Sequence, residues 1–192
     1  MPSIVLASGS QYRAALLSKL RLDFTVCSRD IDETALPGES AEALAGRLSL
    51  AKTQAISSIY PEHFIIGSDQ VAVCKGRFLH KPGDLENAVR QLKAQSGQVV
   101  RFYTGLCVLN SASGEYLSDM DVCAVHFRSL NEQQIRRYVD LEQPFDCAGS
   151  FKAEGLGIAL FTKIEGEDPN ALIGLPLIKL TALLSRFGVE VI

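Results

Sequence analysis

The sequence predicts a single α/β domain with a mixed sheet, extending over residues 1–192. Short apolar runs typical of strands alternate along the chain with segments whose apolar residues recur every three or four positions, as in helices. Two β-rich segments are joined by a few small polar residues, which favours antiparallel pairing there. A chain of 192 residues with 47% hydrophobic content is long enough to bury a core as one domain.

The first half of the chain begins with an apolar run that ends at Ser8, and helical spacing follows it. Ser40 is a typical N-cap and predicts a helix that ends at Pro61. A second apolar strand then runs into polar residues, so Asp69 is expected at the end of a strand. Asp84 is expected to cap a further helix.

The second half opens with β-rich segments at 99–110 and 119–128. Asn131 should cap a helix that ends before Pro144. A glycine-rich stretch at 148–157 follows, and the chain ends with a helix.

Composition excludes several classes of protein. No apolar run approaches the roughly 20 residues of a membrane span, and the first residues lack the pattern of a secretory signal, so we expect a cytoplasmic protein. Five widely spaced cysteines without a C-x-x-C motif argue against a disulfide framework or a zinc site. A net charge of -3 argues against binding to nucleic-acid polymers.

Two sets of residues are candidates for a phosphate and metal site. Ser8, Ser10 and Arg13 lie where a strand meets a helix N-terminus, which can bind an anion, although Ser10 as a simple cap and Arg13 on a solvated face are the alternative. Asp69, with Asp32 and Glu33, offers carboxylates suited to Mg²⁺. The alternative is a strand-end turn at Asp69 and a solvated loop at the other two.

Three lysines complete this set. Lys52 borders the buried face of the predicted helix, Lys81 precedes a proline, and Lys152 lies in the glycine-rich stretch. Each alone is typical of a surface lysine. Together with Arg13 they supply the cations that a triphosphate of about four negative charges requires.

The motifs in chain order resemble the Maf family of nucleotide pyrophosphatases over almost the whole sequence. They are L-A-S-x-S-x-x-R at 6–13, D-E-T at 32–34, Lys52, G-S-D-Q at 67–70, K-P at 81–82, A-G-S-F-K-x-E-G at 148–155, D-P-N at 168–170 and G-L-P at 174–176. The resemblance implies an ITPase-like fold: an elongated, mixed, twisted sheet flanked by helices, with a deep cleft between two lobes.

The same resemblance implies a role for each matching residue. Asp69 is the general base, and Asp69 with Glu33 would hold a divalent cation, Mg²⁺ or Mn²⁺; because a metal ligand cannot freely act as a base, the division of these roles stays open. The implied phosphate ligands are Ser8, Ser10, Arg13, Lys52 and Lys81. The reaction would be displacement at the α-phosphorus with loss of pyrophosphate.

Three positions are similar to the branch of the family that acts on 7-methyl-GTP. These are Tyr12, Gln70 and Glu154, where the branch that takes dTTP and UTP usually has arginine, threonine and glutamine. N7-methylguanine carries positive charge, so Tyr12 can stack on it with a cation-π component and Glu154 can meet its charge. Gln70 can bond the base edge with donor and acceptor. The alternative has Tyr12 packing on the helix and Glu154 solvated.

We therefore expect an enzyme that hydrolyses 7-methyl-GTP to 7-methyl-GMP and pyrophosphate, clearing modified nucleotides from the pool. The alternatives are a pyrophosphatase for dTTP, UTP or other noncanonical triphosphates, and a nucleotide-responsive regulator of cell division and septum formation, with which the family is also associated. The expected partner is the nucleoside triphosphate, without nucleic acid or membrane. A homodimer is compatible with the sequence.

Overall fold

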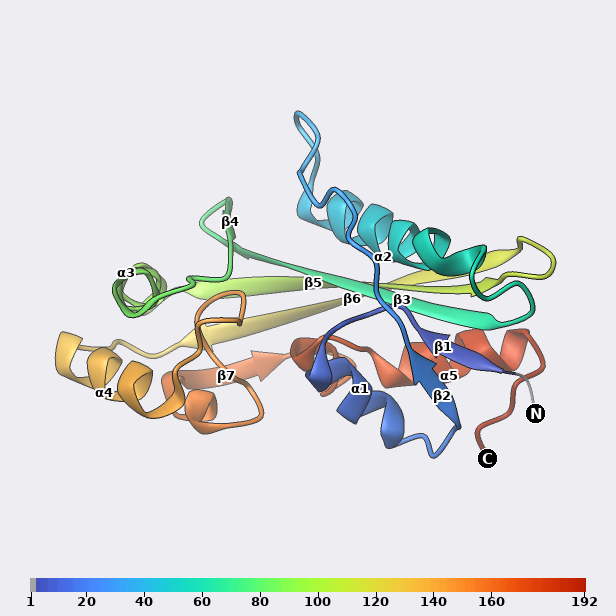
Figure 1. The fold of residues 1–192 in the computed structure, drawn as a ribbon. Helices are drawn as coiled ribbons and strands as arrows, with labels where there is room; N and C mark the ends of the chain where they lie inside the picture. The colour runs from blue at the N-terminus through green and yellow to red at the C-terminus, as the bar shows by residue number, and fades with distance from the viewer. Residues whose placement is uncertain (1–2) are drawn as a thin grey trace. The chain divides into compact units, whose positions relative to one another are not determined.

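The computed structural model describes residues 3–192 (Figure 1). The strands hydrogen-bond in the order β2-β1-β3-β5-β6-β7, with β4 paired to β3. By its internal contacts the chain divides into two compact units. Unit 1 holds the described residues up to 70 with 103–121 and 168–192, and unit 2 holds 71–102 and 122–167. Three strands contribute residues to both units: β3 (Phe64–Cys74), β5 (Val99–Asn110) and β6 (Tyr116–Phe127).

Unit 1 has helices on both faces of its part of the sheet (Figure 1). Its other elements are β1 (Ile4–Leu6), α1 (Gln11–Ser18), β2 (Phe24–Val26), α2 (Ala41–Ser57), the short 3₁₀ helix η2 (Ala171–Ile173) and α5 (Leu177–Arg186). Strand β1 pairs in parallel with β2 and β3. Its side chains alternate: Ile4 and Leu6 pack with residues of α1 and α5, whereas Val5 packs with Ile56 of α2. Both faces of β1 are therefore buried.

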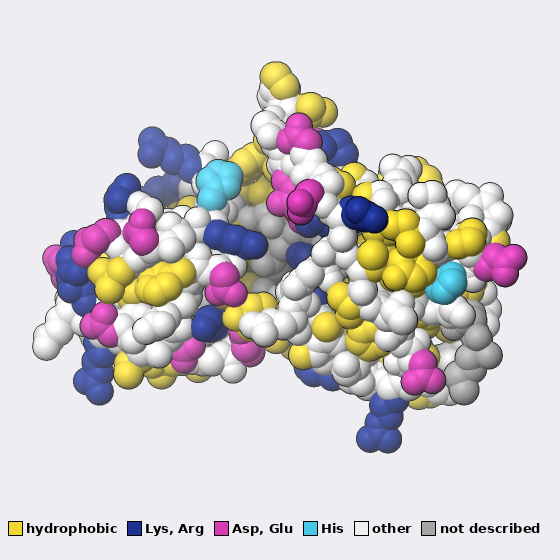
Figure 2. Space-filling view, viewed as in Figure 1, with side chains coloured by type: hydrophobic (Ala, Val, Ile, Leu, Met, Phe, Trp, Pro, Cys, Tyr) yellow, Lys and Arg dark blue, Asp and Glu magenta, His cyan; other side chains and the backbone are white. Residues whose placement is uncertain are grey.

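Unit 2 is built around aromatic rings and two helices. Its other elements are β4 (Arg77–Leu79), α3 (Leu85–Gln95), α4 (Glu132–Glu142), the 3₁₀ helix η1 (Leu156–Leu160) and β7 (Phe161–Glu165). Strand β4 is antiparallel to β3, and β7 to β6. The ring of Phe151 packs edge-on against Phe102, Phe127 and Phe161 at 4.9–5.6 Å. Over α3 and α4, acidic and basic side chains alternate (Figure 2), and Lys93 pairs with Glu132 at 2.8 Å.

The structure confirms the α/β class and the three predicted caps. The side chains of Ser40, Asp84 and Asn131 each accept a backbone N-H in the first turn of α2, α3 and α4. All five cysteines are free thiols. Among residues 3–192, no helix has the length and apolar character to span a membrane. The single-domain assignment stays a prediction.

The structure differs from the predictions at two element boundaries and in two short strands. Helix α2 ends at Ser57, before Pro61, because Ile59 and Tyr60 both donate to the Ile56 carbonyl in a turn. Strand β6 begins at Tyr116 and not at 119, since Glu115 already accepts a cross-strand bond from Asn110. The short strands β4 and β7 carry no clear sequence signal and were not predicted.

Candidate active site

The junction of β1 and α1 brings together the first predicted phosphate ligands. Ser8 is buried, and its hydroxyl oxygen accepts the Ser10 N-H at 3.2 Å. The Ser10 Oγ accepts the Arg13 N-H at 3.3 Å, so Ser10 is the N-cap of α1. A cap at this position leaves other first-turn N-H groups directed out of the helix end, where an anion is favoured.

Arg13 is held across unit 1 and does not lie on a solvated face. Its Nε donates to the Gly174 carbonyl at 2.8 Å, and Nη1 lies 3.5 Å from Ser8 Oγ. Burial lowers the pKa of the Arg13 guanidinium from its ordinary value, and the charges of Asp69 and Glu33 oppose that shift. An arginine stays protonated in proteins, so this part of unit 1 contains a fixed, partly desolvated cation.

Two carboxylates converge on the ammonium of Lys52. Lys52 Nζ forms an ion pair with Asp69 Oδ1 and another, at 2.9 Å, with Glu33 Oε1. The side chains of Lys52 and Asp69 are 15% and 11% exposed, whereas that of Glu33 is 59% exposed. Asp69 is therefore shielded from solvent on most sides, and Glu33 reaches in from an exposed loop.

Glycines in β3 and β5 let helix α2 approach the sheet closely enough for this pairing. A Cβ on Gly67 would lie 2.2 Å from the Ser49 carbonyl oxygen, and one on Gly105 would lie 2.3 Å from that of Ala45. Contacts this short are sterically impossible, so each position requires glycine. Lys52 lies one turn beyond Ser49 on α2, and Asp69 lies two residues beyond Gly67. Gly67 in the G-S-D motif thus allows the close approach that brings Lys52 to Asp69.

Asp69 lies in the middle of β3 and not at the end of a strand, which corrects the prediction. Strand β3 continues to Cys74 because its second part pairs with β4, a strand the sequence did not reveal. The backbone in the middle of a strand bonds to neighbouring strands, so the Asp69 carboxylate is not needed to bond the backbone of a turn. This leaves Asp69 to its ion pair with Lys52.

The side-chain amide nitrogen of Gln70 forms hydrogen bonds within unit 1. Its Nε2 lies 3.0 Å from Thr104 Oγ1, 2.9 Å from the Ala171 carbonyl and 3.1 Å from the Leu172 carbonyl. Carbonyl oxygens only accept, so they fix the orientation of the amide, whose two N-H groups are both engaged. In this structure both N-H groups of Gln70 therefore bond within unit 1, and its contact with a base edge stays a prediction.

The D-P-N and G-L-P motifs form one braced segment. The buried Asp168 carboxylate accepts N-H groups from Asn170 at 2.7 Å and from Ile178 at 2.6 Å, the latter at the start of α5. The Gly174 carbonyl then accepts both Arg13 and the buried Ser68 hydroxyl. No role was predicted for Asp168 or Ser68, although both lie in polar motifs beside glycine or proline, which was the available signal.

The pair Asp69 and Glu33 fits a divalent ion that binds together with its substrate. Both carboxylates already face one cation, the Lys52 ammonium. Among residues 3–192, no group of three or more His, Cys, Asp or Glu side chains is placed to hold a metal. Mg²⁺ commonly takes one or two carboxylates and fills its octahedron with water and substrate phosphates. The donor set matches that mode and not a closed protein site.

The remaining predicted residues are less constrained. Lys81 and Glu154 are exposed in unit 2, and Tyr12 is half-buried in the first turn of α1. Asp32 is exposed, and its pKa is lowered chiefly by hydrogen bonds from Thr34. Lys152 donates to the Glu142 carbonyl at 2.7 Å, which closes the end of α4. In this structure Lys152 therefore serves helix α4 and is not presented as a phosphate ligand.

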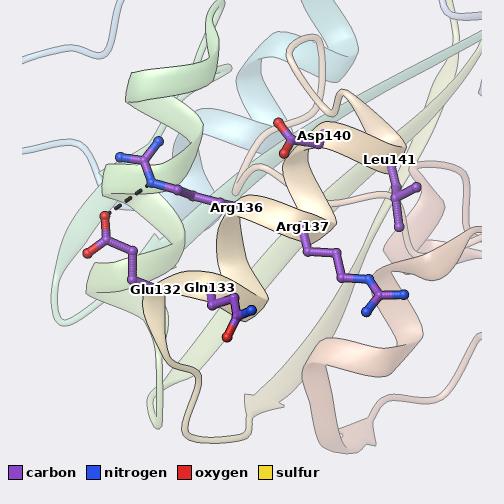
Figure 3. Close-up of a pocket in the computed structure, with 6 residues that line it drawn as sticks. All are labelled: Glu132, Gln133, Arg136, Arg137, Asp140 and Leu141. Atoms are coloured by element: carbon purple, nitrogen blue, oxygen red, sulfur yellow. Dashed lines mark hydrogen bonds and ion pairs between the residues drawn. The ribbon is translucent and has the colours of Figure 1, made fainter.

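A surface hollow of about 630 Å³ lies over the exposed face of α4 (Figure 3). It is lined by Glu132, Gln133, Arg136, Arg137, Asp140 and Leu141. All six residues belong to one helix, and Arg136 is paired with Glu132 at 3.1 Å. None of the predicted site residues borders it, so it adds nothing to the candidate active site.

Residues 3–187 match the Maf-like protein family, and the chain belongs to that family. A relative from Pseudomonas aeruginosa, named 7-methyl-GTP pyrophosphatase, is 54% identical over 191 residues and covers 100% of both chains. One of the same name from Vibrio vulnificus is 54% identical over 189 residues, covering 98% of this chain and 97% of its own. Among solved structures, a HAM1 protein from Coxiella burnetii has a TM-score of 0.52 at 14% identity, over 97% of this chain and 100% of its own, which supports the ITPase-like fold.

Proposed function

We propose that this chain is a nucleoside triphosphate pyrophosphatase that hydrolyses 7-methyl-GTP to 7-methyl-GMP and pyrophosphate. The observation that carries the proposal is the shielded Asp69 carboxylate, paired with Lys52 and close enough to Arg13 to influence its pKa. Relatives named 7-methyl-GTP pyrophosphatase, 50–54% identical over essentially the full chain, support both the reaction and the substrate. Such an enzyme removes a modified nucleotide from the cellular pool.

The chemistry requires a base that activates water and positive charge close to the phosphate oxygens. Asp69 accepts a proton from water as the water oxygen bonds to the α-phosphorus. The bond from that phosphorus to its bridging oxygen breaks, and pyrophosphate leaves with the bonding electrons. Lys52 and Arg13 stabilise the negative charge that develops on the phosphate oxygens, because a cation attracts such charge more strongly where water is partly excluded.

Lys52 has to exchange part of its carboxylate pairing for phosphate when substrate binds. Glu33 is its exposed partner, so that pair has the lower cost of separation. Asp69 and Glu33 are the ligands proposed for Mg²⁺ or Mn²⁺, and the bound ion would polarise phosphate oxygens and acidify a coordinated water. Ser8, Ser10 and Lys81 are proposed as further phosphate ligands on the strength of their motifs.

Selectivity for the methylated base is assigned to Tyr12 and Glu154. N7-methylation places positive charge on the guanine ring, which an aromatic face and a carboxylate both favour over the neutral base. Gln70 is proposed to contribute through its acceptor oxygen, since its nitrogen is bonded to Thr104 and to the segment 171–172.

The test is to identify products from the purified protein with 7-methyl-GTP and Mg²⁺ or Mn²⁺. The expected products are 7-methyl-GMP and intact pyrophosphate in equal amounts, and a chelator should stop their formation. GTP, dTTP and UTP in parallel reactions should be poorer substrates. Release of single phosphate as the first product would exclude this reaction, and a preference for dTTP or UTP would reassign the substrate.

A further inference from the structure

Helix α3 in unit 2 carries three amide side chains along one face. Asn87, Gln91 and Gln95 are spaced by four residues, a separation that stacks side chains one turn apart. Gln95 is fully buried, and Gln91 is half-buried. We call these three residues the α3 amide stripe.

The N-terminal part of the stripe holds the backbone on both sides of Lys81. Gln91 Nε2 donates to the His80 carbonyl at 2.8 Å, and Asn87 Nδ2 donates to the Pro82 carbonyl at 3.1 Å. One residue further along, the Gly83 N-H donates to the Phe145 carbonyl at 3.0 Å. The peptide groups around Lys81 are thus fixed by hydrogen bonds although the Lys81 side chain is exposed.

The C-terminal part of the stripe holds the glycine-rich segment. Gln95 Nε2 donates to the Gly149 carbonyl at 2.9 Å, and Gln91 Oε1 accepts the Ser150 hydroxyl at 2.9 Å. Gly149 and Ser150 both have positive φ, +79° and +62°. A serine in this region is strained and persists only when its surroundings determine it, which these amide contacts do.

We propose that the α3 amide stripe positions the phosphate ligand Lys81 and the segment that leads to Glu154. Gln91 is its central member, because one amide group binds the K-P segment with its nitrogen and the glycine-rich segment with its oxygen. These residues are positioning residues and do not touch substrate. The proposal rests on the proposed function, which makes Lys81 a phosphate ligand.

The physical reason lies in the length of a lysine side chain. An exposed lysine has many rotamers, so the volume that its ammonium samples is set mainly by where its backbone is held. The His80 and Pro82 carbonyls are held by one helix, which keeps the region that the ammonium samples in one place. A displacement of about 1 Å in a catalytic group is enough to cost as much as 10²-fold in rate.

The experiment is a double-mutant cycle in the full-length protein between Gln91→Leu and Lys81→Ala, read as kcat/KM for 7-methyl-GTP. Gln91→Leu alone should lower kcat/KM by roughly 10-fold. In the Lys81→Ala background the same change should cost clearly less, because the group it positions is gone. Gln133→Leu, on the exposed face of α4 (Figure 3), is the matched control and should leave kcat/KM unchanged.

Hydrogen exchange separates this proposal from the proposed function. Amides in residues 80–83 and 149–152 should exchange faster in Gln91→Leu than in the wild type and in Gln133→Leu. If the wild type hydrolyses no triphosphate, the proposed function fails, and unchanged exchange in both segments then overturns the positioning role as well. If the wild type is active, an equal loss of kcat/KM from Gln91→Leu in the wild type and in Lys81→Ala overturns the positioning role. If Gln91→Leu does not fold, Asn87→Ala takes its place in the same cycle, with the same readings.

Discussion

The two units hold their candidate ligands in different ways. In unit 1, Arg13 and Lys52 are partly buried and each is tied directly: Arg13 to the Gly174 carbonyl, Lys52 to Asp69 and Glu33. In unit 2, Lys81 and Glu154 are exposed. Order in unit 2 comes from contacts to the backbone around Lys81. The charged side chains of unit 1 are thus held by contacts within the fold, so substituting one of them should change both stability and catalysis. Substituting Lys81 or Glu154 in unit 2 should change catalysis alone.

The largest effect is expected from the proposed base. Asp69→Asn keeps the shape of the side chain but cannot take a proton, so kcat should fall by about 10² to 10⁴-fold, the range for general-base catalysis. The variant should still fold, with a lower Tm, because Lys52 loses one of its two carboxylate charges and keeps the ion pair with Glu33. Kinetics and a melting curve on the same preparation check both points. Near-normal turnover in a folded variant would remove Asp69 from the role of base.

Lysine substitutions test the comparison most directly. Lys52→Ala and Lys81→Ala should each lower kcat/KM by roughly 10 to 150-fold, for loss of a charge-assisted contact of about 1.5 to 3 kcal/mol. Lys52→Ala should also lower Tm, because a shielded Asp69 loses its cation, whereas Lys81→Ala should shift stability by less than about 0.5 kcal/mol. Thermal unfolding of both variants decides. Equal Tm losses would contradict the contrast between the units.

A glycine substitution tests the close packing of α2 without touching charge. Gly67→Ala places a methyl group against the Ser49 carbonyl and should cost about 1 to 3 kcal/mol, with a further loss of activity as Lys52 is displaced. Gly46→Ala is the matched control within α2: its nearest neighbour would be Met120 at 3.9 Å, so stability should rise by about 0.5 to 1 kcal/mol. Denaturant unfolding measures both. A neutral Gly67→Ala would show that the helix can move away.

Specificity substitutions give the most selective effect. Glu154→Gln preserves shape and deletes the charge. The transition-state stabilisation measured by kcat/KM should therefore fall by about 1 to 3 kcal/mol for 7-methyl-GTP and by much less for GTP. Tyr12→Ala should act in the same direction, and the two losses need not add if both residues touch one base. Competing substrates at one pH and one metal concentration are required, because deprotonation of the methylated ring at higher pH weakens its cationic character. Equal losses for both nucleotides would assign these residues to general positioning.

Sequence patterns predicted what depends on local interactions. Caps at Ser40, Asp84 and Asn131 follow from side chains that bond within one turn, and the fold class follows from apolar periodicity. The family resemblance selected Asp69 and Lys52, which the structure places in contact.

Contacts between distant segments could not be predicted in the same way. The three acceptors of Gln70 lie 34 to 102 residues further along the chain, and Lys152 bonds a carbonyl at the end of α4. Glycine was visible at position 67, but the carbonyl that demands it belongs to another element. The identity of a side chain shows that it can form a hydrogen bond. Which group it bonds to depends on how the helices and strands pack.

The packing of α2 on Gly67 and Gly105 also restricts how Lys52 can move. With backbone carbonyls of the helix already at the limit of approach to β3 and β5, the helix has no room to slide toward the sheet. In the proposed reaction, the ammonium would exchange between Glu33, Asp69 and an incoming phosphate by rotation about side-chain bonds. Rotation of one side chain is a smaller motion than the shift of a whole element, which takes microseconds or longer. If Lys52 binds phosphate as proposed, its ammonium can change partners while helix α2 stays in place on the sheet.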